Sequence, residues 1–167
     1  MSTDTQDMDF ATKPLPEHEW LNNLVGEWRV ESEMTMGEDT MKGTGTEKVT
    51  NLGGLWAYSE GSGTMPDGST MEYRSALGYD VSFKEYRYVW FASVSSHAWN
   101  YKGTLSEDGR TMTLDCEGPD MAVEGKTAKY RDVLTIIDED NRSYTSSGQD
   151  ENGNWVQYMK SHYHRIK

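Results

Sequence analysis

Turn signals divide the chain at regular intervals from residue 26 onward, and this spacing constrains the fold more than any other feature. Asp-Gly and Asn-Gly pairs supply the positive φ angles that tight antiparallel hairpins need. Nine signals separate ten segments of strand length, so neighbouring segments are expected to pair in sequence order. The signals lie at residues 37–39, 53–54, 66–68, 80–82, 95–96, 108–109, 118–120, 138–141 and 152–153.

A meander of this kind leaves two exposed edges unless the sheet curls until they pair. The sequence therefore predicts an all-β fold, an antiparallel up-and-down barrel of about ten strands. Glycines in MKGTGTEKV and SEGSGT lie inside strand-like runs, where they mark the sharp bends that a small barrel needs. Such a barrel can be packed solid or can hold one small ligand.

Alternation with a period of two residues indicates which side chains face the interior. One face of the first strand is predicted to point inward, with Trp28, Val30, Ser32, Met34 and Met36. A later segment repeats the pattern and places an acid on its apolar face, with Ala128, Tyr130, Asp132, Leu134 and Ile136.

A short helix is predicted before the first strand. Apolar side chains of HEWLNNLV, residues 18–25, lie on one side of a helix, and Gly26 ends it. Residues 1–13 are polar and are predicted to form a disordered tail. Residues 14–167 are then expected to form a single β-barrel domain.

The formal net charge of −12 narrows the classes of partner. Lys and Arg are scattered rather than clustered, which argues against nucleic acid, and the acidity argues against anionic membrane surfaces. The first residues lack the basic and apolar regions of a signal peptide, so a cytoplasmic protein is expected. Cys116 is the single cysteine and is interpreted as a small core residue.

Several long segments resemble the bacterial family catalogued as domain of unknown function 1579. They are HEWLNNLVGEW (18–28), NLGGLW (51–56), LGYD (77–80), LDCEGPD (114–120), EGKTAKYRDV (124–133) and WVQYMKSHYHR (155–165). The resemblance implies a lipocalin-like (calycin) barrel without an assigned activity. Gly26-Glu27-Trp28 also resembles the Gly-x-Trp signature of lipocalins, fatty-acid-binding proteins and nitrobindins. In those families the tryptophan closes the bottom of the barrel and the ligand enters from the opposite end.

Aromatic residues on the predicted inner face are candidates for lining a ligand site. We expect them to surround a small amphipathic or hydrophobic molecule. The candidates are Trp28, Tyr73, Trp99, Tyr101, Tyr130 and Tyr163.

His97 shares a strand face with Trp99, which places an imidazole inside the barrel or at its mouth. Paired with Asp132, it can act as a general base whose tautomer the carboxylate fixes, as proton abstraction or hydrolysis requires. A hydrogen-bonded pair that only satisfies two buried polar groups explains the same residues, and so does a role in orienting a ligand. His97 and Asp132 are therefore candidates for both catalysis and ligand binding.

Tyr163 and Arg165 lie on one face near the end of the last strand, where they can hold a carboxylate through charge-assisted hydrogen bonds. Fatty-acid-binding proteins use an arginine and a tyrosine similarly, in the order Arg-x-Tyr, which is reversed here. An exposed terminal arginine is the alternative interpretation. Either Glu47 or Glu60 can project inward, where two carboxylates would suggest acid–base chemistry, but placement on the surface is favoured.

His162 and His164 share a face, but a metal would need a third ligand that the sequence does not identify, so no metal site is predicted. Nitrobindins bind haem through a histidine within a similar barrel. That resemblance gives His97, His162 or His164 the same role, and no local motif chooses among them. The cofactor, if any, stays open.

Three functions are consistent with the sequence. The favoured one is a barrel that binds a small molecule. The alternatives are an enzyme that uses the His97 and Asp132 pair, and a solid-cored structural or interaction protein. Self-association through an outer strand face is compatible with all three.

Overall fold

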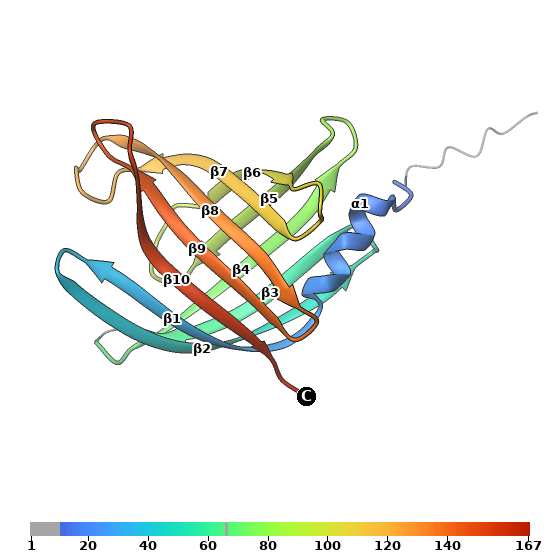
Figure 1. Cartoon of the computed structure of the whole chain (residues 1–167), viewed down its shortest axis with the longest axis horizontal. Coiled ribbons are helices and arrows are strands. Elements are labelled where there is room, and N and C mark those ends of the chain that lie inside the picture. The colour runs from blue at the N-terminus through green and yellow to red at the C-terminus, as the bar shows by residue number, and fades with distance from the viewer. Residues whose placement is uncertain (1–10, 66) are drawn as a thin grey trace, which may run out of the picture.

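Ten antiparallel strands close into a barrel in the computed structural model, which describes residues 11–65 and 67–167 (Figure 1). Of the predicted tail, residues 1–10 lie outside the described residues. Helix α1 (Pro16–Glu19) continues directly into the 3₁₀ helix η1 (Trp20–Leu24). The strands are β1 (Gly26–Met36), β2 (Asp39–Leu52), β3 (Trp56–Thr64), β4 (Thr70–Asp80), β5 (Glu85–Ala92), β6 (Trp99–Leu105), β7 (Thr111–Pro119), β8 (Thr127–Asp138), β9 (Asn141–Gln149) and β10 (Trp155–Arg165).

Each strand pairs with its neighbours in sequence, and β1 pairs with β10 to close the barrel. The predicted ten-stranded antiparallel barrel with a short N-terminal helix is confirmed. All nine turn signals fall at the ends of strands or between them. The helix begins at Pro16, two residues before the predicted start, because proline suits the first helical position. Among the described residues, no helix is long and apolar enough to cross a membrane.

The two helices lie against one end of the barrel, which we call the closed end (Figure 1). The Trp20 indole N–H donates to the Gly109 carbonyl oxygen at 2.7 Å, in the β6–β7 turn. His18 is buried, and its Nε2 donates to the Tyr79 carbonyl oxygen at 3.0 Å, at the end of β4. These two hydrogen bonds attach the helices to the β6–β7 and β4–β5 hairpins. The opposite end, with the hairpins β1–β2, β3–β4, β5–β6, β7–β8 and β9–β10, is the open end.

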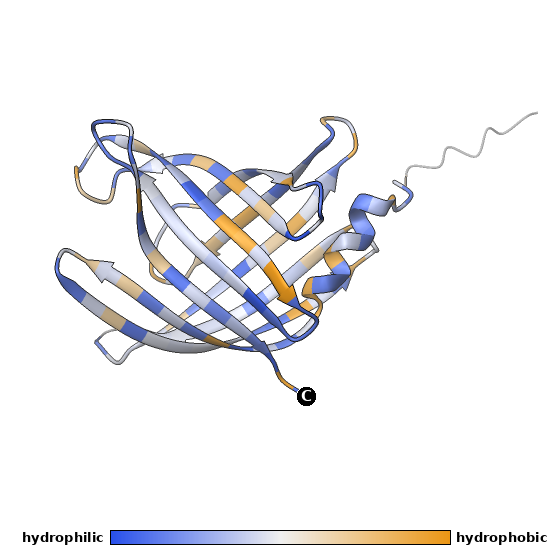
Figure 2. Cartoon of the chain, viewed as in Figure 1, coloured by the Kyte–Doolittle hydropathy of each residue, from blue (hydrophilic) through white to orange (hydrophobic). Residues whose placement is uncertain are grey.

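The apolar core gathers under the helices. Hydrophilic and hydrophobic residues alternate along most strands, and a more continuous hydrophobic run ends β8 next to the helices (Figure 2). Burial of these side chains is the main stabilising contribution to the closed end. The buried apolar residues there include Leu21, Leu24, Trp28, Val49, Ala57, Leu77, Met112, Leu114 and Leu134.

Glycines allow close approaches of neighbouring side chains in the barrel wall. A Cβ at Gly61 of β3 would overlap the Tyr73 ring, which lies across it from β4. Gly26 has a φ of 138°, and a Cβ there would overlap the Arg165 guanidinium. Both positions therefore need a residue without a side chain.

A β-bulge in β10 corrects the predicted alternation of that strand. Strict alternation, counted back from Tyr163 and Arg165, would place Trp155 inside and Tyr158 outside, but the register shifts between Gln157 and Met159. Trp155 consequently lies on the outer face, where the Arg131 guanidinium covers its ring at 4.5 Å. Tyr158 turns inward and meets the Tyr130 ring edge-on at 6.5 Å. An extra residue in one strand reverses the facing of everything beyond it.

Candidate functional site

Asp132 of β8 is the centre of a buried polar cluster halfway along the barrel. The residue is 4% exposed, and the Tyr144 hydroxyl donates to Asp132 Oδ2 at 2.6 Å. The Tyr101 phenol and the Ser146 hydroxyl also face the carboxyl. Burial raises the pKa of Asp132, and the nearby hydroxyl groups of Tyr144, Ser146 and Tyr101 oppose that rise. We call these four residues the Asp132 cluster.

One oxygen of this carboxyl has no partner. Asp132 Oδ1 is fully buried and lacks a hydrogen bond at bonding geometry, although Tyr101 and Ser146 lie near the carboxyl. Leaving a buried acceptor unsatisfied costs about 1–3 kcal/mol. Such a cost is usually offset by a water molecule or a ligand, so the Asp132 cluster has an open position for a hydrogen-bond donor.

Glu47 and Arg142 form a second buried polar group nearer the closed end. Arg142 Nη2 lies 2.5 Å from Glu47 Oε2, and the two side chains are 5% and 6% exposed. The guanidinium lies 4.2 Å from the Trp28 ring centroid and 4.3 Å from that of Tyr163. Arg142 Nη1 has no hydrogen-bond partner. The expectation that Glu47 is exposed is wrong, because β9 brings an arginine opposite it.

Arg165 makes its contacts at the closed end of the barrel rather than in the interior. Its guanidinium covers the Trp28 ring at 4.2 Å, and its Nη1 and Nε donate to the carbonyl oxygens of Val25 at 2.6 Å and Glu139 at 3.1 Å. The Trp28 indole N–H donates to the Leu24 carbonyl oxygen at 2.9 Å. Trp28 therefore lies between two arginines, and the one beside Tyr163 is Arg142 rather than the predicted Arg165.

His97 lies in the loop between β5 and β6, at the open end. Its ring meets the Trp99 ring edge-on at 4.7 Å, and the Trp99 ring in turn meets that of Tyr130 at 5.0 Å. The Tyr130 hydroxyl donates to the Pro119 carbonyl oxygen at 2.7 Å. Among the described residues, no hydrogen bond or ion pair joins His97 to Asp132, whose nearest partners are phenols.

Tyr73 extends the polar lining toward the open end. Its ring stacks on Trp90 at 5.7 Å, and its phenol faces that of Tyr163. Burial raises the pKa of Tyr73 far above its ordinary value, and the neighbouring Tyr163 and Glu47 add to the rise. The interior phenols therefore stay protonated and can act as hydrogen-bond donors.

The other histidines lie away from the interior. His162 and His164 stack at 4.2 Å on the outer face of β10, where both approach Asn141 Oδ1. Burial and the neighbouring His164 lower the pKa of His162. Within residues 11–65 and 67–167, no three His, Cys, Asp or Glu side chains form a group that could hold a metal. Of the three histidines that the resemblance to nitrobindins offers for haem, His97 lies at the mouth and would be the one to hold it.

Cys116 lies on the inner face of β7, opposite Tyr130. Burial raises the pKa of its thiol to about 12, and the Asp132 charge contributes. A thiol that stays protonated near neutral pH is a poor nucleophile, in line with the expected core role.

A small cavity lies between the apolar core and the polar side chains above it. Its volume is about 30 Å³, enough for about one water molecule. It is lined by Arg142, Tyr144, Tyr163 and Tyr88 together with Ser59, Ser75 and apolar residues of the core. The alternation of residues along β9 could have identified Tyr144 and Ser146 as inward-facing. It could not have shown that Arg142 and Glu47 meet across the barrel.

Comparisons with known proteins support the fold. Residues 13–165 match the family described as "Protein of unknown function (DUF1579)". No curated protein matches the chain. The crystal structure of Rv2717c from M. tuberculosis is similar, with a TM-score of 0.68, 15% identity, and coverage of 93% of this chain and 100% of that one. The S-type phycobiliprotein lyase CPES from Guillardia theta has a TM-score of 0.61, 14% identity, and coverage of 89% and 92%. At these identities the likeness concerns the fold alone.

Proposed function

The chain belongs to the family described as "Protein of unknown function (DUF1579)", which assigns no activity, and we propose from the geometry that it binds a small amphipathic molecule through its open end. The observation that carries this proposal is a buried polar cluster with an unpaired acceptor, Asp132 Oδ1, beneath an apolar, solvent-reached mouth. The mouth consists of the inner side chains of the open end: Met34, Met41, Met71, Trp90, Trp99, Tyr158 and Met159.

The two halves of the barrel are filled to different degrees. Met112, on the closed half, is 0% exposed, whereas Met34, on the inner face of the open half, is 37% exposed. Apolar side chains that line an opening without being covered gain free energy when a ligand excludes water from them. This favours an apolar ligand body at the mouth.

The polar end of the ligand is assigned to the Asp132 cluster. A hydroxyl, amine or amide N–H can donate to Asp132 Oδ1, while the Tyr101 and Tyr144 phenols are available around it. The cavity of about 30 Å³ is too small for such a molecule. The ligand therefore lies above the cavity, between the Asp132 cluster and the mouth.

The two alternatives have less support. An acid–base pair of His97 and Asp132 needs contact, and the described residues show none between these two side chains. A solid-cored interaction protein agrees with the small cavity but leaves the unpaired carboxyl oxygen unexplained.

Native mass spectrometry tests the proposal first. The purified chain is compared before and after denaturation, and a stoichiometric bound mass that disappears on denaturation is the expected result. The same sample is then titrated with a neutral, environment-sensitive fluorescent dye that carries an amine. Absence of both a bound mass and saturable dye binding would overturn the container interpretation and favour the solid core.

Paired substitutions locate the site. Asp132→Asn keeps the shape of the side chain but removes the carboxyl, and we expect it to weaken dye binding about tenfold, the equivalent of one strong hydrogen bond. Asp115→Asn, on the outer face of the neighbouring strand β7, is the matched control and should bind as the unchanged protein does. Circular dichroism confirms that both variants are folded. Equal affinities of the two variants would place the dye elsewhere.

A further inference from the structure

Three methionines lie in one row across three neighbouring strands at the open end. In the strand register, Met34 of β1 is directly opposite Met159 of β10 on one side and Met41 of β2 on the other. Directly paired residues of antiparallel strands point to the same face, with Cβ atoms about 4.5–5.5 Å apart. Met34 lies four residues after Val30 and six after Trp28, both of which are buried, so it shares their face of the strand, which is the inner one. We call these residues the methionine row.

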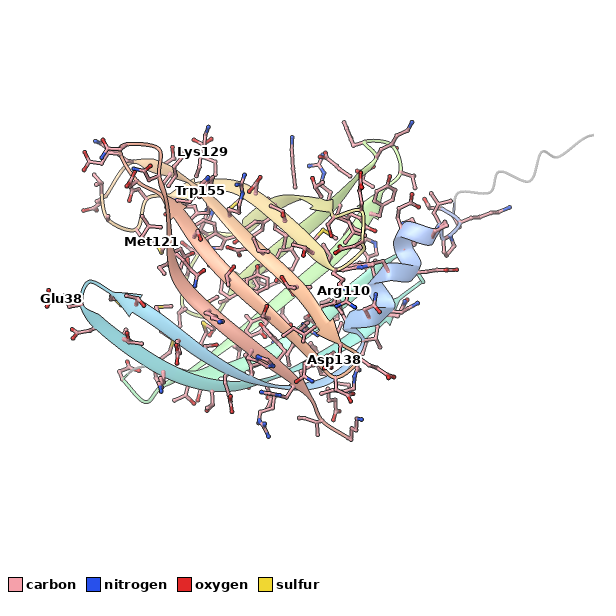
Figure 3. All side chains as sticks on the ribbon, in the orientation of Figure 1. Glu38, Arg110, Met121, Lys129, Asp138 and Trp155 are labelled. Carbon is pink, nitrogen blue, oxygen red and sulfur yellow. The ribbon has the colours of Figure 1, made fainter. Side chains whose placement is uncertain are left out.

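The row belongs to a wider concentration of thioethers. Seven of the eight methionines in residues 11–65 and 67–167 lie at the open end, and Met112 alone lies in the closed half. Figure 3 shows one of the seven, Met121, at the end of the barrel that also carries Trp155 and Glu38, opposite Arg110 and Asp138. Besides the row, the open-end methionines are Met36, Met65, Met71 and Met121.

These methionines are not core packing. Met34 is 37% exposed and Met36 is 60% exposed, and Met41 and Met159 are half-buried, so solvent reaches these side chains. A methionine side chain is unbranched and has three rotatable bonds, which lets its sulfur adjust over several ångströms. On the concave inner face of a barrel, side chains from neighbouring strands converge, so three sulfur atoms can meet one point above Met34.

We propose that Met34, Met41 and Met159 bind one soft monovalent cation, Cu⁺ or Ag⁺, through their three thioethers at the open end of the barrel. Neutral thioethers select soft ions such as Cu⁺ over Zn²⁺, Mg²⁺ or Ca²⁺, which prefer nitrogen, thiolate or oxygen ligands. The net charge of −12 raises the local concentration of cations near the protein. Binding changes no oxidation state and releases no proton, since thioethers carry none.

The methionine row also lines the mouth of the small-molecule site proposed above, but the groups that would hold the polar end of the ligand are different ones. The Asp132 cluster lies deeper in the barrel, and its oxygen atoms are poor ligands for a soft ion. Cys116 is the competing soft ligand, and its thiol stays protonated at neutral pH because burial raises its pKa to about 12. Asp132→Asn is therefore expected to weaken dye binding and to leave Ag⁺ binding unchanged, which distinguishes failure of one proposal from failure of the other.

Isothermal titration of the full chain with Ag⁺ in chloride-free buffer tests the proposal, with anaerobic Cu⁺ competition against a chromogenic chelator as the second probe. We expect one ion per chain, both in the unchanged protein and in Cys116→Ser. Met34→Leu, which conserves volume, should weaken binding by about tenfold or more. Met121→Leu, an open-end methionine outside the row, is the matched control and should bind normally.

Methyl NMR of methionine-labelled protein gives the location directly. On addition of Ag⁺, the methyl resonances of Met34, Met41 and Met159 should shift, while that of Met112 should stay in place. Absence of binding, unchanged affinity in Met34→Leu, or loss of binding in Cys116→Ser would each overturn the proposal. The first of these results would leave the row as an apolar lining of the mouth.

Discussion

The closed and open ends of the barrel are built from the same alternating strands but differ in how their inner side chains are covered. At the closed end, Trp28 lies between two guanidinium groups, and a helix covers the core. At the open end, the inner side chains stay in contact with solvent, and the hairpins β1–β2 and β9–β10 extend beyond the last β1–β10 pair, Met34 with Met159. This difference shows that the closed end depends on specific contacts, such as those of the two arginines with Trp28, whereas the mouth is lined by flexible side chains such as methionine.

The largest effect on stability is expected from removing the buried ion pair between Glu47 and Arg142 near the closed end. Arg142→Met leaves Glu47 without a partner in an apolar region, and we expect the free energy of unfolding to fall by about 3–5 kcal/mol. Urea denaturation followed by tryptophan fluorescence measures the change. The double variant Glu47→Gln with Arg142→Met should recover part of the loss, because no charge is then left buried and unpaired. Additive losses in the double variant would contradict this coupling.

The second prediction applies one substitution at both ends. Met112→Ala opens a cavity in the closed half and should cost about 2–5 kcal/mol of unfolding free energy. Met34→Ala, at a position that solvent already reaches, should change it by about 0.5 kcal/mol or less. Thermal and urea unfolding of the two variants give the comparison. Equal losses at the two positions would mean that the open half is packed as tightly as the closed half.

The sequence predicts the barrel because its strongest signals are local. A turn can be recognised from adjacent residues such as Asp108 and Gly109. The inner face of a strand can be recognised from apolar residues two positions apart, such as Trp28 and Val30. The candidate site depends on contacts between distant strands, which periodicity does not encode. Glu47 and Arg142 are 95 residues apart, and each alone resembles a surface residue.

Two further differences have local physical causes. The β10 bulge adds one residue to the strand and reverses the facing of Trp155, which no turn or composition signal indicates. Arg165 shares a strand face with Tyr163, as predicted, but the barrel ends there, so its guanidinium meets backbone carbonyls of the closed end. The alternation of a strand gives the facing of a side chain, and the end of the barrel decides what it contacts.

The smallest expected effect is a change in pH dependence at the boundary between the two halves. Burial raises the pKa of Asp132 in the folded protein above its unfolded value, so its contribution to stability is complete below the unfolded pKa. That contribution is lost as the pH rises through the folded pKa. Asp132→Asn has no such group, so its stability relative to the unchanged protein should rise from pH 4 toward neutral pH.

Urea midpoints measured at pH 4, 5, 6 and 7 check this change of stability with pH. Asp115→Asn is the control, since it removes an exposed carboxylate paired with Arg131 rather than a buried carboxyl. A difference between Asp132→Asn and the unchanged protein that is constant with pH would mean that solvent reaches the carboxyl. The Asp132 cluster would then belong to the wet open half, and the boundary between the two halves would lie below it, at the pair of Glu47 and Arg142.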